Sequence, residues 1–335
     1  MKKINVGIIG LGIGLKHLKN LNKNKNVNMI YIFDFDEKKL KKLSINKSLK
    51  NIIKVINEEE IFKNSKIDLV CICSYDNYHY YHVKKAFKNN KHIFVEKPLC
   101  LKSEELNSIE KMAKIKKNIY MCSNFVLREN SFFKDLKKKI KNNFFGKIYL
   151  IEANYNYGRL EKIVKGWRGK INNYSVTHGG GVHLIDLIIE LTNKKLKSVI
   201  SHGNNISTKI FGLKLYDCVS SIIRCTDEST INLISNFGSV TPHHHVLKIF
   251  GTKATSIYDL NNFLLINNTN KKKIFTFKNI KNMKTGVLKD FINKVVSVNK
   301  SDKKFLIKEK NNLIKITKHC INIDKSIKSR NWQKI

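Results

Sequence analysis

The sequence predicts an α/β protein with an N-terminal doubly wound parallel sheet, followed by an α+β domain with a large, open, mostly antiparallel sheet. The first third of the chain alternates short β-branched runs with charged stretches of helical periodicity, as a parallel sheet covered by helices requires. After about Asn130 the pattern changes to successive alternating runs without long helices between them, which indicates antiparallel strands. A chain of 335 residues is too long to fold around one compact core, so we expect two domains.

The first domain is expected over residues 1–123. Each of its predicted strands is a short apolar or β-branched run, and each predicted helix repeats apolar residues at helical spacing. The strands are Ile4–Ile9, Val27–Phe33, Asp68–Cys73, His92–Val95 and Asn118–Cys122, and the helices are Leu15–Leu21, Glu37–Leu43, Tyr78–Lys88 and Glu104–Lys114.

The second domain is expected over residues 124–335. Its strands are predicted between Ser198 and Phe277, after which helical periodicity returns at Lys284–Val298 and Lys303–Ser326. We expect the last helix to pack back on the body of the protein.

The cellular compartment is predicted from two features. No apolar run approaches the roughly 20 residues of a membrane span, and the N-terminal apolar run is interrupted by glycines, unlike a secretory signal. None of the seven cysteines shows the paired C-x-x-C spacing of a zinc site or a redox motif. We therefore expect a cytoplasmic protein with reduced thiols.

The formal net charge of +38 raises the question of nucleic-acid binding. The excess is nearly all lysine spread along the chain, whereas readers of bases and phosphates favour the fork-shaped guanidinium of arginine. Arginine occurs only at Arg128, Arg159, Arg168, Arg224 and Arg330. We expect no specific nucleic-acid partner and no membrane partner, but a general attraction to anionic ligands.

A glycine turn follows the first predicted strand. In the run from Ile9 to Gly14, Gly10 permits a tight turn, and Gly12 lets backbone N–H groups approach a pyrophosphate at the start of the next helix. The third position of G-x-G-x-x-G holds Leu15, so the pattern fits only if Gly14 serves in a turn that is one residue shorter. This context predicts a dinucleotide-binding Rossmann domain.

Asp34 ends the next predicted strand, 22 residues after Gly12, where an acid binds the adenosine ribose hydroxyls. An acid there repels a 2′-phosphate, which favours NAD over NADP. NADP is not excluded, because Lys38 and Lys39 are near in sequence and offset the repulsion. The structural alternative is that the glycines merely close a turn and Asp34 caps the next helix.

The strand His92–Val95 runs directly into Glu96, Lys97 and Pro98, which places a lysine at the edge of the sheet where ligands bind. Together with the glycine turn, Asp34 and the segment from Ser74 to His79, this sequence resembles the Gfo/Idh/MocA family of oxidoreductases over nearly the whole chain.

The resemblance implies roles for residues of the first domain. Lys97 would lie beside the nicotinamide and the reacting substrate hydroxyl and handle its proton, with a cis peptide before Pro98. The alternative is a surface lysine before a turn proline. Ser74 and Tyr75 would border the nicotinamide ribose, and His79 would orient this loop rather than transfer protons.

A second signature starts at Trp167 and continues from Gly179 to Asp186, where it resembles the family pattern D-x-G-x-H-x-x-D at a helix start. His183 matches the catalytic histidine, and Asp186 is a candidate for orienting it, or a plain helix-surface carboxylate. Gly179 departs from the pattern, since many relatives carry an aspartate there. Either His178 takes over part of its role, or the proton path uses Lys97 and His183 alone.

Other residues of the second domain are expected near the substrate. Arg159 and Arg168 either bind a phosphate or carboxylate of the substrate or form structural ion pairs. Adjacent residues of a strand face opposite sides, so the run His243 to His245 does not converge on one metal ion, and no metal is expected. We expect one of these three histidines to reach the substrate cleft.

The leading hypothesis is hydride transfer between NAD(H) and a secondary alcohol or ketone of a sugar, nucleotide-sugar or cyclitol, a nucleotide-sugar being favoured by the basic surface and the two arginines. The alternatives are a glycosidase that uses NAD transiently and a dinucleotide-binding protein without catalysis. By resemblance, a homodimer or homotetramer is expected.

The expected site residues fall into three groups. The expected catalytic residues are Lys97 and His183. The expected cofactor contacts are Gly10, Gly12, Ile13, Gly14, Asp34, Ser74, Tyr75, His79, Glu96 and Lys97, and the expected substrate contacts are Lys97, Arg159, Trp167, Arg168, His178, Gly179 and His183.

Overall fold

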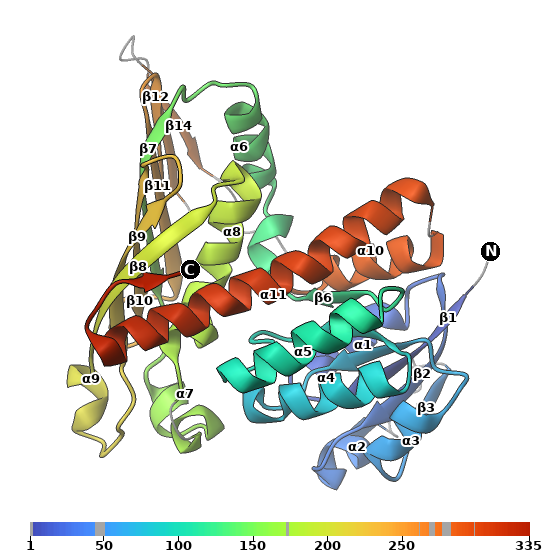
Figure 1. Ribbon diagram of the computed structural model, residues 1–335. Helices are drawn as coiled ribbons and strands as arrows, with labels where there is room; N and C mark the ends of the chain where they lie inside the picture. Colours follow the sequence, from blue (N-terminus) through green and yellow to red (C-terminus); the bar gives the residue numbers. More distant parts are fainter. Residues whose placement is uncertain are drawn as a thin grey trace. The chain divides into compact units, whose positions relative to one another are not determined.

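The computed structural model describes residues 3–43, 51–171, 174–260, 262–267, 272–276, 283–297 and 299–335. The chain forms two compact units (Figure 1). Unit 1 comprises the described residues of Met1–Val126 and Asn282–Thr317, and unit 2 comprises those of Leu127–Lys281 and Lys318–Ile335. Two ends of predicted elements, Phe277 and Val298, lie outside the described residues.

Unit 1 contains a parallel sheet with the strand order β3-β2-β1-β4-β5-β6. The strands are β1 (Ile4–Ile9), β2 (Val27–Phe33), β3 (Ile52–Lys54), β4 (Leu69–Ile72), β5 (His92–Val95) and β6 (Met121–Ser123). This is the order of doubly wound dinucleotide-binding domains, which confirms the predicted fold class of the first domain. β3 was not predicted, and β6 begins three residues later than expected.

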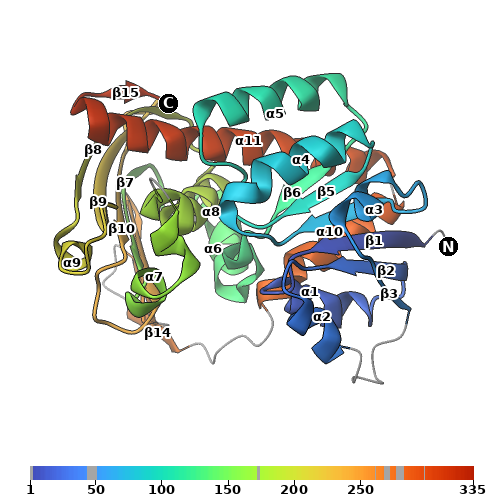
Figure 2. The same ribbon diagram turned by 90° about the horizontal axis from the view of Figure 1, so that it is seen from below.

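Helices cover both faces of this sheet (Figure 2). They are α1 (Gly14–Leu21), α2 (Glu37–Leu43), α3 (Glu58–Lys63), α4 (His79–Lys88), α5 (Ser103–Ile115), α10 (Met283–Ser297) and the first part of α11 (Lys300–Ser329), with a 3-10 turn at Asp76–Tyr78. Ile8 packs in the core that contains α1 and α10. The neighbouring Gly7 faces α3, where a Cβ would lie less than 3.0 Å from Ile61. Alternate residues of β1 therefore serve opposite helix layers.

The grouping of α10 differs from the expected boundary, which assigned all residues after 123 to the second domain. Phe291 and Ile292 of α10 are buried in the same core as Leu18 of α1, and the Phe291 ring lies 6.3 Å from that of Phe94. This apolar face explains why the helix packs with unit 1, although it follows the antiparallel strands in sequence.

Unit 2 contains a sheet with the order β14-β13-β12-β11-β7-β10-β9-β8-β15. All neighbours are antiparallel except β7 and β10, which confirms the predicted, mostly antiparallel sheet. The strands are β7 (Ile148–Asn156), β8 (Leu196–Asn204), β9 (Cys218–Cys225), β10 (Thr230–Asn236), β11 (His244–Gly251), β12 (Ala254–Asp259), β13 (Asn262–Asn267), β14 (Lys272–Thr276) and β15 (Gln333–Lys334). β7 was not predicted.

One face of this sheet is covered by helices, and side chains of β9 on the other face are exposed. α8 (Val182–Thr192) packs on β7, and α6 (Ser131–Lys141) packs on α8 (Figure 1). Burial alternates along β9, so that Ile223 is buried while Ile222 is 47% exposed. Shorter helices are α7 (Glu161–Val164) and α9 (Ile206–Lys209), with 3-10 turns at Val126–Glu129 and Trp167–Lys170 and a π-helical turn at Thr177–Gly181. No helix among the described residues has the length and hydropathy of a membrane span.

The packing of α10 is testable by truncating Phe291. Phe291→Ala should lower the free energy of unfolding by about 3–5 kcal/mol, because it removes a fully buried ring from the core shared with α1. Urea denaturation of the full chain measures this change. The control Lys289→Ala, on the exposed side of the same helix, should change it by less than about 0.5 kcal/mol. Equal effects of the two variants would contradict the assignment of α10 to this core.

Candidate functional site

The glycine turn after β1 is pressed against the end of β4. Gly10 has a φ of 91°, and a Cβ there would lie 2.5 Å from the carbonyl oxygen of Cys73. Its N–H donates to the carbonyl of Phe33 at the end of β2. Both the backbone conformation and the space therefore demand glycine at this position.

Gly12 and Gly14 serve different purposes. A Cβ at Gly12 would meet no protein atom within 4 Å, whereas one at Gly14 would lie 3.0 Å from Ile8 and 3.3 Å from Cys73. Gly14 thus provides the close helix–strand packing of the motif's third glycine, in the turn one residue shorter that the sequence required. Ile13, the N-cap residue of α1, offers no side-chain acceptor to the first N–H groups of the helix. The open space at Gly12 and this helix start fit a dinucleotide pyrophosphate.

Asp34 is buried at the end of β2, beside the glycine turn. Its carboxylate accepts hydrogen bonds from the N–H groups of Leu11 and Asp36, at 2.5 and 2.8 Å, and pairs with Lys39 at 3.2 Å. The acid thus supports the local turn, and its contact with the adenosine ribose stays a prediction. The ammonium of Lys39 partly offsets its negative charge.

His79 connects the loop after β4 with the loop after β5. Its ring is fully buried, with Nδ1 2.5 Å from the carbonyl oxygen of Pro98 and Nε2 3.1 Å from that of Ser74. Both ring nitrogens therefore face main-chain carbonyl oxygens, one from each loop. The geometry favours a loop-orienting role over direct proton transfer. The Lys97–Pro98 peptide bond is cis, as expected.

Glu96 holds the loop that carries Lys97. Its Oε1 lies 2.9 Å from Nε2 of His17 in α1 and accepts a hydrogen bond from Asn124 at 2.8 Å. Burial alone would raise the pKa of Glu96, but the hydrogen bonds with His17 and Asn124 and the charge of Lys97 hold it below its usual value. The carboxylate of Glu96 thus binds residues of unit 1 and holds the loop of Lys97, while its expected contact with the cofactor stays a prediction.

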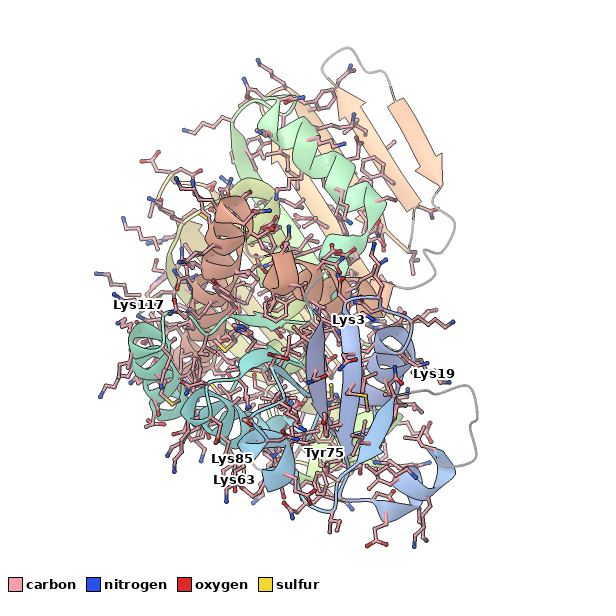
Figure 3. The ribbon with its side chains drawn as sticks, turned by 90° about the vertical axis from the view of Figure 1, so that its right-hand side faces the viewer. Lys3, Lys19, Lys63, Tyr75, Lys85 and Lys117 are labelled. Atoms are coloured by element: carbon pink, nitrogen blue, oxygen red, sulfur yellow. The ribbon has the colours of Figure 1, made fainter. Side chains whose placement is uncertain are left out.

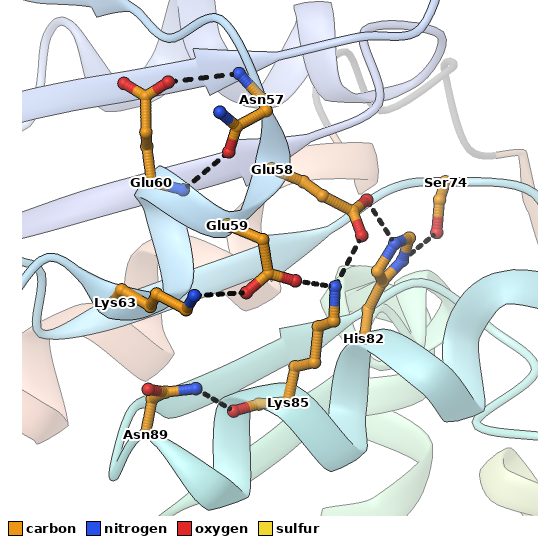
Figure 4. Close-up of polar contacts among 9 residues, drawn as sticks. All are labelled: Asn57, Glu58, Glu59, Glu60, Lys63, Ser74, His82, Lys85 and Asn89. Carbon is orange, nitrogen blue, oxygen red and sulfur yellow. Dashed lines mark hydrogen bonds and ion pairs between the residues drawn. The ribbon is translucent and has the colours of Figure 1, made fainter.

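The Ser74 hydroxyl is the first member of a relay that the sequence did not reveal (Figure 4). It lies 2.9 Å from Nδ1 of His82, whose Nε2 lies 2.9 Å from Glu58, and Lys85 pairs with the same carboxylate. Burial alone would raise the pKa of Glu58, but the hydrogen bonds from His82 and Lys85 lower it to about 2. The ionised Glu58 therefore fixes the ring of His82, which fixes the Ser74 hydroxyl. Tyr75, next in the chain, is 48% exposed.

The lysine excess is distributed around unit 1. Figure 3 shows Lys19, Lys63 and Lys85 on the separate helices α1, α3 and α4, with Lys3 before β1 and Lys117 after α5. Absence of specific nucleic-acid binding stays a prediction, and this distribution supports it.

In unit 2, the second signature forms the π-helical turn Thr177–Gly181 and the start of the buried helix α8. Asp186, fully buried, forms a two-point ion pair with Arg128, in which Nε of Arg128 donates at 2.8 Å and Nη2 donates to the second oxygen. Arg128 was not assigned by the sequence analysis. The pair anchors the turn of α8 that follows His183.

His183 belongs to an aromatic cluster on the covered face of the sheet. Its ring stacks on Tyr155 of β7 at 6.2 Å, and Tyr155 meets His243 and His245 edge-on at 5.3 and 5.0 Å. His244 contacts Asn156 instead. His243 and His245 therefore lie on the Tyr155 side, and a contact of one histidine of the run with the substrate stays a prediction.

The cluster contains no metal-binding arrangement. Burial, together with the neighbouring His243 and His244, lowers the pKa of His245 to about 3, so its ring is neutral at physiological pH. Throughout the described ranges, no group of three or more His, Cys, Asp or Glu side chains is placed to hold a metal ion. Tyr155 is a candidate site residue that sequence reasoning missed, whereas His245 belongs to the histidine run from which one substrate contact was expected. The available signal was the alternate pair Tyr155 and Tyr157 at and just after the end of β7.

The two arginines expected near the substrate are associated with aromatic rings. Arg168 lies 4.3 Å from the ring centroid of Trp167, and Arg159 lies 6.0 Å from that of Tyr157. Burial raises the pKa of Tyr155, while the positive charges of Arg168 and Arg159 act in the opposite direction. Both guanidinium groups therefore lie close enough to Tyr155 for their positive charges to act on its phenol.

His178 is buried against α11. Burial lowers its pKa to about 4, and its Nε2 lies 3.6 Å from Oδ2 of Asp324. Burial raises the pKa of Asp324 to about 7, although Asp324 accepts a hydrogen bond from Ser175. His178 is thus a neutral ring beside a carboxyl group that titrates near neutrality.

The comparisons with known proteins agree with this geometry. Residues 4–124 match the sequence model described as an oxidoreductase family with an NAD-binding Rossmann fold, and residues 133–257 match the GFO/IDH/MocA C-terminal domain. The chain belongs to the Gfo/Idh/MocA family. This confirms the resemblance, the fold class and the NAD-binding character of the N-terminal domain.

Similar proteins include inositol dehydrogenases. The chain is 30% identical over 153 residues to the myo-inositol 2-dehydrogenase of Thermotoga maritima, which covers 44% of each protein and so less than half of that relative. The fold is similar to that of myo-inositol 2-dehydrogenase from Lactobacillus plantarum, with a TM-score of 0.80 and 20% identity over 100% of both chains. It is also similar to that of scyllo-inositol dehydrogenase from Lactobacillus casei with bound NAD(H) and scyllo-inositol, with a TM-score of 0.78 and 18% identity over 99% of both chains.

The raised pKa of Asp324 predicts a pH-dependent stability. Folded protein holds this carboxyl protonated up to about pH 7, whereas the unfolded chain releases the proton near 3.8. The carboxyl therefore costs stability increasingly as the pH rises between these values. The free energy of unfolding of the wild type minus that of Asp324→Asn should fall between about pH 4 and about pH 7. Urea denaturation at several pH values measures this difference; a flat or rising difference would contradict the burial of the carboxyl.

Proposed function

We propose that this protein is an NAD-dependent dehydrogenase that transfers a hydride between NAD(H) and a secondary alcohol or ketone of a sugar, nucleotide-sugar or cyclitol. Unit 1 would bind the cofactor, and unit 2 would supply the substrate-binding residues. The observation that carries the proposal is the bridge made by His79, which ties the loop of Lys97 to the loop that borders the glycine turn.

The position of Lys97 supports its proposed role. Lys97 follows β5 directly, and the loop is held on one side by Glu96, bound to His17 and Asn124, and on the other by His79. A lysine on such a preorganised loop at the carboxyl edge of a parallel sheet suits proton transfer with a bound substrate hydroxyl.

NAD, when bound, accepts or supplies the hydride. The protein's own groups handle the proton: Lys97 takes it from the substrate hydroxyl during oxidation and returns it during reduction. His183 is the proposed second acid–base group, since histidine changes its protonation near neutral pH. Its stacking on Tyr155 holds the ring in a defined orientation.

The substrate class rests on two lines of support. The names of the relatives favour a cyclitol, whereas Arg159 and Arg168 beside the aromatic cluster favour a substrate that bears a phosphate or carboxylate. A panel of cyclitols, hexoses and nucleotide-sugars therefore covers the proposal.

Replacing Lys97 tests the mechanism. Lys97→Ala should lower kcat by about 100-fold or more on the best substrate of the panel, because it removes the group that takes the substrate proton. Steady-state formation of reduced nicotinamide measures kcat, and cofactor binding, followed by fluorescence, should persist. The exposed Lys88→Ala serves as the matched control. Unimpaired turnover by Lys97→Ala would refute the role of this lysine.

A further inference from the structure

Ser74 joins two sets of hydrogen bonds in unit 1. Its hydroxyl lies 2.9 Å from Nδ1 of His82, and its carbonyl oxygen lies 3.1 Å from Nε2 of His79. Both histidines belong to α4, whereas Ser74 lies in the loop after β4. The ring of His79 continues to the next loop, with Nδ1 2.5 Å from the carbonyl oxygen of Pro98. Ser74 therefore connects His82 to the loop that carries Lys97.

The proton arrangement at the Ser74 hydroxyl is set by Glu58. Burial alone would raise the pKa of Glu58, but the hydrogen bonds from His82 and Lys85 lower it to about 2, so the carboxylate only accepts hydrogen bonds. Nε2 of His82 lies 2.9 Å from this carboxylate and must carry the proton between them. In a neutral ring Nδ1 then has no proton and accepts the one of the Ser74 hydroxyl. The ionised carboxylate thereby gives the serine hydroxyl a single orientation.

Packing holds the His82 ring in the plane that this arrangement requires. The ring is fully buried and stacks on Phe62 at 6.0 Å and on Tyr78 at 6.2 Å. Its carboxylate partner is the first residue of α3, a helix whose start is closed by a capping box (Figure 4). Both members of the histidine–carboxylate pair therefore have fixed positions.

α3 and α4 are tied together without this pair. Nζ of Lys85 in α4 lies 2.9 Å from Oε1 of Glu58 and also pairs with Glu59. A buried histidine beside a carboxylate costs desolvation energy, which an apolar side chain in the same place would not. What His82 adds to the tie between the helices is its hydrogen bond with Ser74.

We propose that Glu58 and His82 are positioning residues for Lys97. They act through Ser74, whose carbonyl oxygen binds the His79 ring that also contacts the loop of Lys97. This inference rests on the proposed function, in which Lys97 takes the substrate proton. Glu58 and His82 do not act on the substrate themselves; they fix the frame on which the reacting lysine lies.

Glu58→Gln removes the charge and keeps the size of the side chain. Its amide can donate to Nε2 of His82 as well as accept from it, so the Ser74 hydroxyl loses its single orientation. Hydrogen exchange of the full-length protein, followed by mass spectrometry, should be about 10-fold faster than in the wild type over residues 74–79 and 96–99, because both loops open more easily. The kcat on the best substrate of the panel should fall by about 10-fold with little change in KM, since a displaced reacting group slows the step after binding.

Glu59→Gln is the matched control, because this carboxylate belongs to the same helix and also pairs with Lys85, while His82 bonds its neighbour. It should leave exchange and kcat as in the wild type. His82→Phe keeps the stacked ring and removes both nitrogens, so it should behave as Glu58→Gln does. Combining Glu58→Gln with Ser74→Ala should cause no further loss beyond that of Ser74→Ala alone, since the path passes through Ser74.

The exchange data and the turnover data separate this inference from the proposed function. Faster exchange of both loops in Glu58→Gln, in a protein that shows no hydride transfer with any compound, would support the positioning of the Lys97 loop and refute the proposed function. Wild-type exchange and kcat in Glu58→Gln would overturn the inference and leave the proposed function standing. Equal effects of Glu59→Gln, or a further loss in the double variant, would also overturn it, because the effect would then not pass through Ser74.

Discussion

The hydrogen bonds of the His79 ring to Ser74 and Pro98 are the interaction on which the cofactor side of the site depends. They join two loops at the carboxyl edge of the sheet. The first of these loops also meets the glycine turn, because Gly10 has no Cβ to separate it from Cys73. The ends of β1, β4 and β5 are thereby held together, and Lys97 lies on the loop that follows β5. Proton transfer needs such fixed geometry, since small displacements of a reacting group cost large factors in rate.

The fold of unit 1 was largely predictable because its central strands are mostly apolar runs followed by glycine or charged turns. β1, β2 and β5 have the expected bounds. β3 is three residues long and mostly exposed, so it lacks the burial that makes a strand visible in a sequence. The packing of α10 with α1 depends on Phe291 meeting residues more than 190 positions away, and local periodicity carries no information on such partners.

The site residues, like the elements of the fold, divide into those that the sequence predicts and those that only the folded chain brings together. Motif residues such as Gly10, Asp34 and Lys97 were recognisable because their roles depend on short spacings along the chain. Tyr155 was not, because strand pairing and helix packing bring it to His183 and His245. The absence of an aspartate at Gly179 was visible in the sequence as a gap. Only the structure shows that the hydroxyl end of Tyr174 lies where a side chain at Gly179 would begin.

The central claim is net hydride transfer to NAD, and rapid mixing tests it most directly. Protein loaded with NAD would be mixed with each compound of the substrate panel while the near-ultraviolet absorbance of reduced nicotinamide is recorded. The account predicts that reduced cofactor accumulates in proportion to the oxidised product and persists. A signal that rises and returns to zero would indicate transient redox chemistry, and no signal with any compound would indicate binding without catalysis. Either of these two results would contradict the account.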